Sequence, residues 1–150
     1  MELLNYEVLK KSGYEGYILE SAPEKVMQFG EGNFLRAFVD YWFDVANEKA
    51  GWNGKCVLVQ PIPQGLTDMI NAQEGLYTLY LRGRENGEKV DRKRVISSVS
   101  RCVNPYEKEG FDAMMELAVS DDLEYIVSNT TEAGIVYDPE CRMEDRPCSS

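Results

Sequence analysis

Histidine is absent from this sequence of 150 residues. Histidine is the commonest general base near neutral pH, so its absence excludes the Ser-His and Cys-His arrangements of nucleophilic catalysis. Any proton transfer by this chain has to use a lysine, a tyrosine or a carboxyl group.

Basic residues are in the minority, with 16 lysines and arginines against 26 acidic residues and a formal net charge of -10. This balance disfavours nucleic acid and anionic membrane surfaces as general partners. No stretch approaches the roughly 18 apolar residues of a membrane span, and no secretory signal pattern opens the chain. We therefore expect a soluble, cytoplasmic protein with no nucleic-acid or membrane partner, which binds any anionic ligand locally through helix N-termini and a few arginines.

The four cysteines contain no Cys-x-x-Cys pair. This spacing favours reduced structural thiols over a zinc knuckle or a redox dithiol, and no metal site is expected. With 43% hydrophobic residues and no internal repeat, the chain is long enough to form one domain with its own core.

The segment 25–36, KVMQFGEGNFLR, combines a short apolar strand, two closely spaced glycines and the start of a helix. Gly30 and Gly32 allow the backbone to turn where a side chain would clash. From Phe34 onward the apolar residues recur with helical spacing and predict one buried face, made of Phe34, Leu35, Phe38, Tyr41, Trp42 and Val45. The helix is expected to end between Asn47 and Gly51.

A strand, a glycine turn and a helix start together predict an anion site. The free backbone N–H groups of Gly32, Asn33 and Phe34 would point out of the helix, where the helix dipole favours negative charge. We interpret this segment as a dinucleotide-binding turn. The local pattern is equally compatible with a tight βα turn that binds nothing, because Leu35 stands where the usual fingerprint has a third glycine.

A second apolar strand is predicted over residues 55–60, which completes a βαβ unit. In dinucleotide folds the residue that closes this strand meets the adenosine ribose, and an acid there binds the 2′-hydroxyl group. Gln60 holds that position. A glutamine can bond a hydroxyl and no arginine is obviously placed for a 2′-phosphate, so this position leaves the choice between NAD and NADP open.

The middle of the chain departs from βαβ alternation. A short helix is predicted over 65–73 and strands over 76–81 and 95–103, with a hairpin turn at Asn86-Gly87. We expect an antiparallel excursion whose basic residues form either a solvated face or a positive rim for an acidic ligand; they are Arg82, Arg84, Arg92, Lys93 and Arg94.

The last third predicts another helix and strand. A helix is expected to start over residues 104–107 and to bury Phe111, Met114, Met115 and Ala118. A third parallel strand over 123–128 then opens into SNTTEAGI, residues 128–135. These polar side chains lie where a doubly wound sheet presents its ligand site, although a polar turn that caps the next helix is the alternative.

These patterns predict an α/β fold, a Rossmann-type doubly wound and mostly parallel sheet with an antiparallel hairpin excursion. We expect an N-terminal arm over residues 1–24, the dinucleotide-binding domain over 25–137 and a connector over 138–150.

The sequence resembles the mannitol dehydrogenase family of polyol and uronate reductases. The family's turn, Gly-x-Gly-x-Phe with an arginine two places on, is met by Gly30, Gly32, Phe34 and Arg36. The residues that carry the resemblance lie in consistent order at Gln28–Asp40, Val59–Pro61, Gly75–Thr78, Leu81–Gly83 and Ser128–Ile135.

The resemblance implies that the domain binds NAD(H) and that hydride passes between nicotinamide and a small sugar-acid or polyol substrate, such as the keto-hexonate tagaturonate. It assigns the pyrophosphate turn to Gly30, Glu31, Gly32, Asn33 and Phe34, turn support or a phosphate contact to Arg36, the adenosine end to Gln60, and the nicotinamide and substrate side to Ser128, Asn129, Thr130 and Glu132.

The resemblance also places the proton-transferring lysine in a large helical C-terminal domain beyond these 150 residues. No catalytic residue is therefore assigned in this chain, which we expect to bind cofactor without turnover. The alternative is a stand-alone nucleotide-binding or regulatory module, since fold alone does not fix function.

Overall fold

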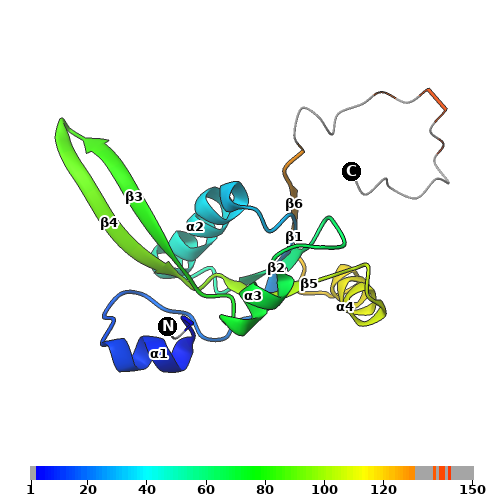
Figure 1. The fold of residues 1–150 in the computed structure, drawn as a ribbon, viewed down its shortest axis with the longest axis horizontal. Helices are drawn as coiled ribbons and strands as arrows, with labels where there is room; N and C mark the ends of the chain where they lie inside the picture. The colour runs from blue at the N-terminus through cyan, green and yellow to red at the C-terminus, as the bar shows by residue number, and fades with distance from the viewer. Residues whose placement is uncertain (1–2, 131–136, 138, 141, 143–150) are drawn as a thin grey trace.

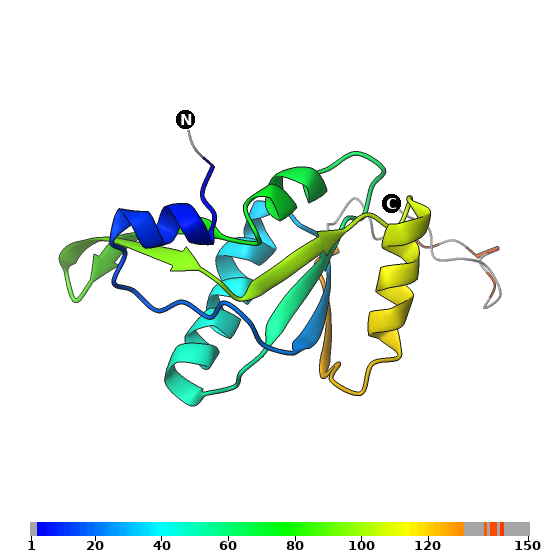
Figure 2. The same ribbon diagram turned by 90° about the horizontal axis from the view of Figure 1, so that it is seen from below.

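The structure is a computed structural model that describes residues 3–130, 137, 139–140 and 142. Its elements follow the chain in the order α1 (Tyr6–Ser12), β1 (Glu24–Phe29), α2 (Asn33–Ala50), β2 (Lys55–Val59), α3 (Thr67–Ala72), β3 (Tyr77–Glu85), β4 (Glu88–Ile96), β5 (Val99–Val103), α4 (Lys108–Ala118) and β6 (Tyr125–Ser128). Figures 1 and 2 show a layered body from which a long hairpin projects. In the described part of the chain, no helix combines the length and the hydropathy of a bilayer-crossing segment.

The central sheet has four parallel strands in the order β5-β2-β1-β6. The chain leaves β1 through α2 to reach β2 on one side, and it returns through α4 to place β6 on the other side. The strand order therefore reverses beside β1, which is the position where doubly wound sheets bind their ligands. The predicted α/β class with a mostly parallel sheet is confirmed.

Two apolar clusters show that helices cover both faces of this sheet. On one face, Val26, Cys56 and Leu58 pack with Ile70 of α3 and Phe43 of α2. On the other face, the alternate strand residues Met27, Val57 and Val59 pack with Ala113, Met114 and Leu117 of α4. A strand that is covered on both faces has no polar alternation, as β2 shows by burying all its residues.

Helix α2 buries a different face from the one that the sequence predicts. Leu35 is buried as expected, but Phe34, Phe38 and Trp42 are 54–62% exposed, while Asp40, Asp44 and Asn47 face inward. The buried polar side chains have hydrogen-bond partners within the chain, which is the condition under which a helix can bury them. Asn47, for example, exchanges two hydrogen bonds with the backbone of Gly54, at 2.8 and 2.9 Å. The predicted end of the helix is confirmed by Gly51, whose φ is 64°.

Helix α4 begins later than predicted and buries a different stripe. Residues 104–107 form a turn of their own, in which the Glu107 N–H donates to Asn104 O at 3.1 Å. The face toward the sheet carries Ala113, Met114 and Leu117, so the prediction for Met114 is confirmed. The predictions for the other three are wrong, because Phe111 and Met115 are each 47% exposed and Ala118 is exposed as well.

The excursion is an antiparallel hairpin of β3 and β4, as predicted. Asn86 and Gly87 form its turn, with φ values of 52° and 85°, which suit an Asn-Gly turn. The predicted strand over 95–103 is wrong as a single unit, because Ser97 and Ser98 separate β4 from β5. This break lets the chain pass from the hairpin into the parallel sheet.

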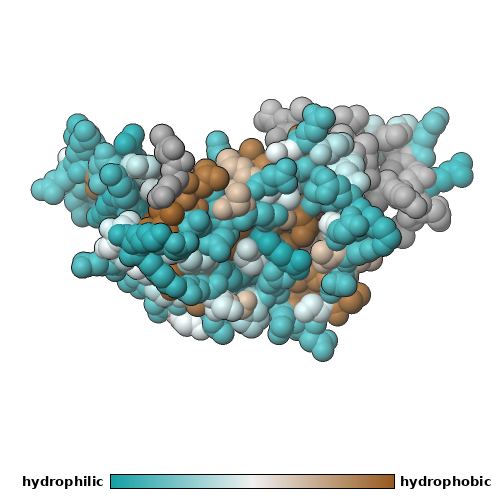
Figure 3. Space-filling view, turned by 60° about the horizontal axis from the view of Figure 1, so that its bottom comes forward, coloured by the Kyte–Doolittle hydropathy of each residue, from teal (hydrophilic) through white to brown (hydrophobic). Residues whose placement is uncertain are grey.

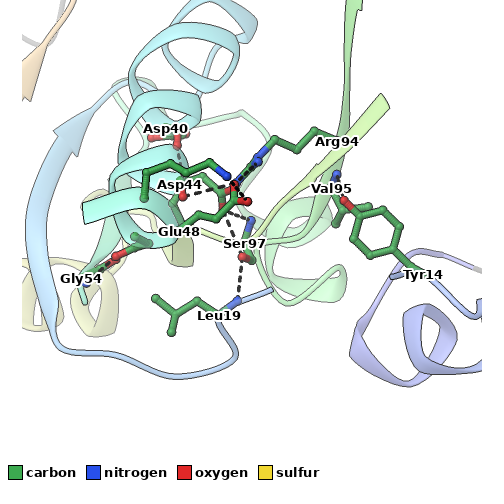
Figure 4. A network of polar contacts seen from close by, with 12 residues as sticks. Tyr14, Leu19, Asp40, Asp44, Glu48, Gly54, Arg94, Val95 and Ser97 are labelled. Carbon is green, nitrogen blue, oxygen red and sulfur yellow. Dashed lines mark hydrogen bonds and ion pairs between the residues drawn. The ribbon is translucent and has the colours of Figure 1, made fainter. Parts of the chain in front are cut away.

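The basic residues of the hairpin are largely paired within the chain. Arg82 binds Asp91 and Arg92 binds Glu85 across the two strands. At the hairpin base, Arg94 reaches Asp44 and Glu48 of α2, as Figure 4 shows. These contacts favour the interpretation of a solvated, internally paired face. The space-filling view in Figure 3 shows that one whole side of the molecule is mostly hydrophilic, with smaller apolar patches.

The N-terminal arm packs against the base of the hairpin. Leu9 of α1 forms a third apolar cluster with Leu76 and Val95. The Leu19 N–H donates to Ser97 Oγ at 3.0 Å, and the Val95 N–H donates to Tyr14 Oη at 3.1 Å. These contacts hold the N-terminal arm against the base of the β3–β4 hairpin.

Candidate dinucleotide site

The glycine turn lies where the sequence predicts it, between the end of β1 and the start of α2. Gly30 follows β1 with a φ of 116°, a conformation that side chains rarely adopt. Its N–H donates to Val59 O at 2.9 Å, so the turn is joined to the end of β2. The turn is thus fixed at the C-terminal edge of the sheet.

The N-terminus of α2 is open. Gly32 is its N-cap residue and no side chain caps the helix at this end, nor does the first turn carry an acidic residue. The first intrahelical bond in this turn runs from the Arg36 N–H to Gly32 O, at 3.2 Å. The N–H groups of Asn33, Phe34 and Leu35 precede that bond and have no partner within the helix. An anion in front of them would gain both hydrogen bonds and the favourable helix dipole.

Within the described chain, neither the backbone conformation nor the packing at position 32 requires a glycine. Its φ is -67°, which any residue adopts, and a β-carbon there would meet no atom within 4 Å. Among the described residues, no atom therefore fills the space next to Gly32 at the front of the helix. A glycine that neither backbone strain nor packing requires leaves room for a ligand to approach the backbone closely.

Arg36 holds the turn together from the first turn of α2. Its Nε donates to Glu31 O at 2.9 Å and its Nη2 donates to Asn33 Oδ1 at 2.7 Å. Its guanidinium carbon lies 5.3 Å from the centroid of the Tyr77 ring. Of the two roles that the resemblance implies for Arg36, these contacts describe turn support.

Glu31 and Gln60 lie together beneath the loop that follows β2. Glu31 is 7% exposed, and a β-carbon built on Gly65 would lie 2.4 Å from Glu31 Oε1 and 2.5 Å from Gln60 Oε1. Gln60 is 2% exposed and uses its amide within the chain. Its Nε2 donates to Ile62 O at 2.8 Å, and its Oε1 accepts from Thr67 Oγ1 at 2.8 Å. The assignment of Gln60 to the adenosine end stays a prediction.

The described start of the second polar stretch, Ser128 to Thr130, lies beside the glycine turn. Ser128 ends β6 and pairs with Phe29, the last residue of β1, and Ser128, Asn129 and Thr130 are all exposed. The parallel register thus brings residues about 100 positions apart in sequence to the same edge of the sheet. Glu132, the fourth predicted residue of this group, lies outside the described residues.

Sequence reasoning assigned no role to three polar residues behind the turn, Gln28, Asp40 and Tyr77. Gln28 and Asp40 are fully buried, and Gln28 Nε2 donates to Gly30 O at 3.2 Å. Tyr77 Oη donates to Arg36 O at 2.6 Å and lies 3.3 Å from Asp40 Oδ2. Burial raises the pKa of Asp40 to about 7, because desolvation disfavours the charged carboxylate.

Comparison with known proteins identifies the architecture. Residues 24–144 match the family described as the mannitol dehydrogenase Rossmann domain. The chain belongs to the mannitol dehydrogenase family. Its Rossmann domain therefore contains the glycine turn, α2 and the polar end of β6 that the fold brings together.

Within this family, the chain is similar to altronate oxidoreductases. It is 48% identical over 128 residues to the protein of Bacteroides thetaiotaomicron, covering 85% of this chain and 26% of that protein. It is 44% identical over 150 residues to the protein of Phocaeicola vulgatus, covering 100% of this chain and 29% of that protein. The chain thus spans between a quarter and a third of the length of these relatives.

Two solved structures share the fold. One is mannitol 2-dehydrogenase of Pseudomonas fluorescens in a ternary complex with NAD and D-mannitol, with a TM-score of 0.70, 23% identity, and coverage of 85% of this chain and 26% of that one. The other is D-sorbitol dehydrogenase in substrate-free form, with a TM-score of 0.65, 19% identity, and coverage of 89% and 28%. The Rossmann-type fold predicted from sequence is confirmed.

Proposed function

We propose that this chain is the NAD(H)-binding domain of an oxidoreductase that transfers hydride between nicotinamide and a sugar acid. The observation that carries the proposal is the open N-terminus of α2 behind Gly32, at the point where the strand order reverses. The presence of NAD in the mannitol 2-dehydrogenase complex supports the choice of cofactor. A cytoplasmic location agrees with the buried free thiols of Cys56 and Cys102.

The substrate pair that we propose for the full-length protein is tagaturonate and altronate. The similarity to altronate oxidoreductases, at 41–48% identity, supports this choice. The nicotinamide supplies the hydride chemistry when it is bound, and the protein supplies binding and orientation.

Each described residue of the site has a proposed task. The amides of Asn33, Phe34 and Leu35 bind the pyrophosphate, with Gly32 leaving room for it. Arg36 keeps the turn rigid through Glu31 O. We assign Gln60 to the wall near the adenosine, and Ser128, Asn129 and Thr130 to the nicotinamide and substrate side. Rigid support of this kind raises affinity by lowering the entropy cost of binding.

The test is a fluorescence titration with NADH of the wild-type chain and two valine variants. Gly32→Val fills the space in front of the helix, so NADH affinity is expected to fall at least about tenfold, which corresponds to about 1.4 kcal/mol. Gly83→Val is the matched control, because Gly83 also has open surroundings and no positive φ but lies on β3. Its affinity for NADH should equal that of wild type. Equal affinities in all three proteins would contradict the proposed turn.

The same titration with NADPH tests the cofactor. We expect NADH to bind more tightly, in keeping with Gln60 in place of a basic residue at the end of β2. Tighter binding of NADPH would overturn the choice of NAD.

A further inference from the structure

The hydroxyl group of Tyr77 lies near two oxygen atoms but can donate only one hydrogen bond. Its Oη lies 2.6 Å from Arg36 O and 3.3 Å from Asp40 Oδ2. A tyrosine hydroxyl donates one hydrogen bond, and the shorter distance assigns that proton to the Arg36 carbonyl. The second contact then needs a proton from Asp40, because an ionised carboxylate would face a lone pair of the hydroxyl oxygen.

The surroundings of Asp40 favour the same protonation state. The carboxyl group is fully buried, and the residues that face it from the strands are Gln28 on β1, Cys56 on β2 and Tyr77 on β3. Among the described residues, Arg36 of its own helix is the cation that acts on it. Asp40 Oδ1 and Gln28 Oε1 lack a hydrogen-bond partner among the described residues. The cost of desolvation outweighs the hydrogen bonds from Tyr77, Gln28 and Cys56, which favour the charged form of the carboxyl group.

Asp40 is connected to the glycine turn by two routes. In the first route, Asp40 contacts the Tyr77 hydroxyl, which donates a hydrogen bond to Arg36 O. The Arg36 side chain in turn donates a hydrogen bond to Glu31 O. In the second route, the neighbouring Gln28 Nε2 donates a hydrogen bond to Gly30 O at 3.2 Å. Both routes end on backbone carbonyls of the turn that precedes the open helix N-terminus.

We propose that Asp40 in its protonated form is a positioning residue for the dinucleotide turn. The Asp40 hydroxyl donates to Tyr77 Oη, and Tyr77 donates to Arg36 O, which fixes the first turn of α2. When Asp40 releases its proton to solvent, the Tyr77 O–H rotates from the Arg36 carbonyl to the new carboxylate. The turn then loses this support, and NADH affinity falls as pH rises through neutrality. This inference rests on the proposed NAD(H)-binding function.

The test measures the NADH dissociation constant between about pH 6 and about pH 8, a range in which a chain without histidine has few other titrating side chains. Wild type is expected to lose affinity several-fold across this range. Asp40→Asn should show a constant, high affinity, because its amide donates to Tyr77 at every pH. Tyr77→Phe should bind weakly throughout, because no hydroxyl reaches the Arg36 carbonyl.

Infrared spectroscopy of the wild-type chain gives a direct second readout. The C=O stretch of a protonated, buried carboxylic acid should disappear as pH rises through neutrality and should be missing from Asp40→Asn. The band follows the protonation of Asp40 itself, whereas a merely structural role for Asp40 would leave the pH profile of NADH binding unchanged.

The outcomes separate this inference from the proposed function. Wild-type NADH binding that does not change with pH, or an unchanged pH profile in Asp40→Asn, would overturn the role of Asp40 and leave the cofactor site standing. An absence of NADH binding by wild type at any pH would overturn both.

Discussion

At the scale of single residues, the buried carboxyl group of Asp40 couples folding to pH. Its pKa is about 7 in the folded chain, against an ordinary value of 3.8. Between these two values the folded state holds a proton that the unfolded state has released. The contribution of Asp40 to the free energy of unfolding is therefore fully present below about pH 4. It falls as pH rises toward 7 and stays reduced above pH 7.

Asp40→Asn is expected to remove this dependence. The variant should gain about 2 kcal/mol of stability over wild type as pH rises from about 5 to about 7, at 1.36 kcal/mol for each pKa unit. Urea unfolding at several pH values measures the difference. Asp91→Asn on the exposed hairpin is the control for the same acid-to-amide change at the surface. A gap between Asp40→Asn and wild type that is constant from pH 5 to 8 would contradict the assignment.

At the scale of secondary-structure elements, the existence of α2 could be predicted and its orientation could not. Helical spacing of apolar residues and Gly51 mark the helix correctly. The acids at 40 and 44 look solvent-facing in sequence because their partners, Tyr77, Ser97 and Arg94, lie more than 35 residues away. Only the tertiary contacts reveal that the polar side of this helix faces inward.

The start of α4 shows a similar limit. Asn104 and Pro105 look like a helix start, but they form a separate turn. Gly110, which weakens a helix in isolation, allows this turn to pack on the helix, since a β-carbon there would lie 2.0 Å from Asn104 O. In the candidate site, likewise, Gly30 and Gly32 could be identified from their spacing, whereas Tyr77 could not, because nothing local connects a strand residue to a turn over 40 positions earlier.

The ion pair between α2 and β4 provides a test at this scale. Asp44 is completely buried, and it accepts from Arg94 Nε at 2.7 Å as well as from the Ser97 N–H at 2.8 Å. Arg94→Met would leave a buried carboxylate without its cation, so unfolding should become easier by about 3 kcal/mol. Urea denaturation checks this value.

Arg82→Met is the matched control for that change. The Arg82 side chain is 67% exposed in its pair with Asp91, so its loss should change stability by less than about 1 kcal/mol. Equal effects of the two substitutions would show that the buried pair adds nothing specific to the join between helix and hairpin.

At the scale of the whole molecule, parallel topology assembles a site from distant parts of the sequence. Phe29, Val59 and Ser128 end neighbouring strands, and this places the glycine turn, the loop after β2 and the polar stretch after β6 along one edge. The polar content of each stretch could be predicted separately. Their adjacency followed from the expected Rossmann-type order, which the sheet confirms.

The isolated chain of 150 residues is expected to bind NADH and to leave tagaturonate unreduced. Reduction of a ketone needs a proton donor at the developing alkoxide, and the resemblance assigns that lysine to a domain beyond this chain. The absorbance of NADH, followed in the presence of tagaturonate, should stay constant. Oxidation of NADH that depends on the substrate would contradict this expectation.

The hairpin is fastened to α2 through both of its strands, by Tyr77 of β3 and by Arg94 of β4. Its far end, at Asn86 and Gly87, extends well away from the sheet (Figure 1). A fluorescent dye attached there would lie away from the glycine turn, on a hairpin that is joined to α2 by these two contacts. The hairpin tip therefore offers a labelling position from which the proposed coenzyme binding could be followed without altering the turn.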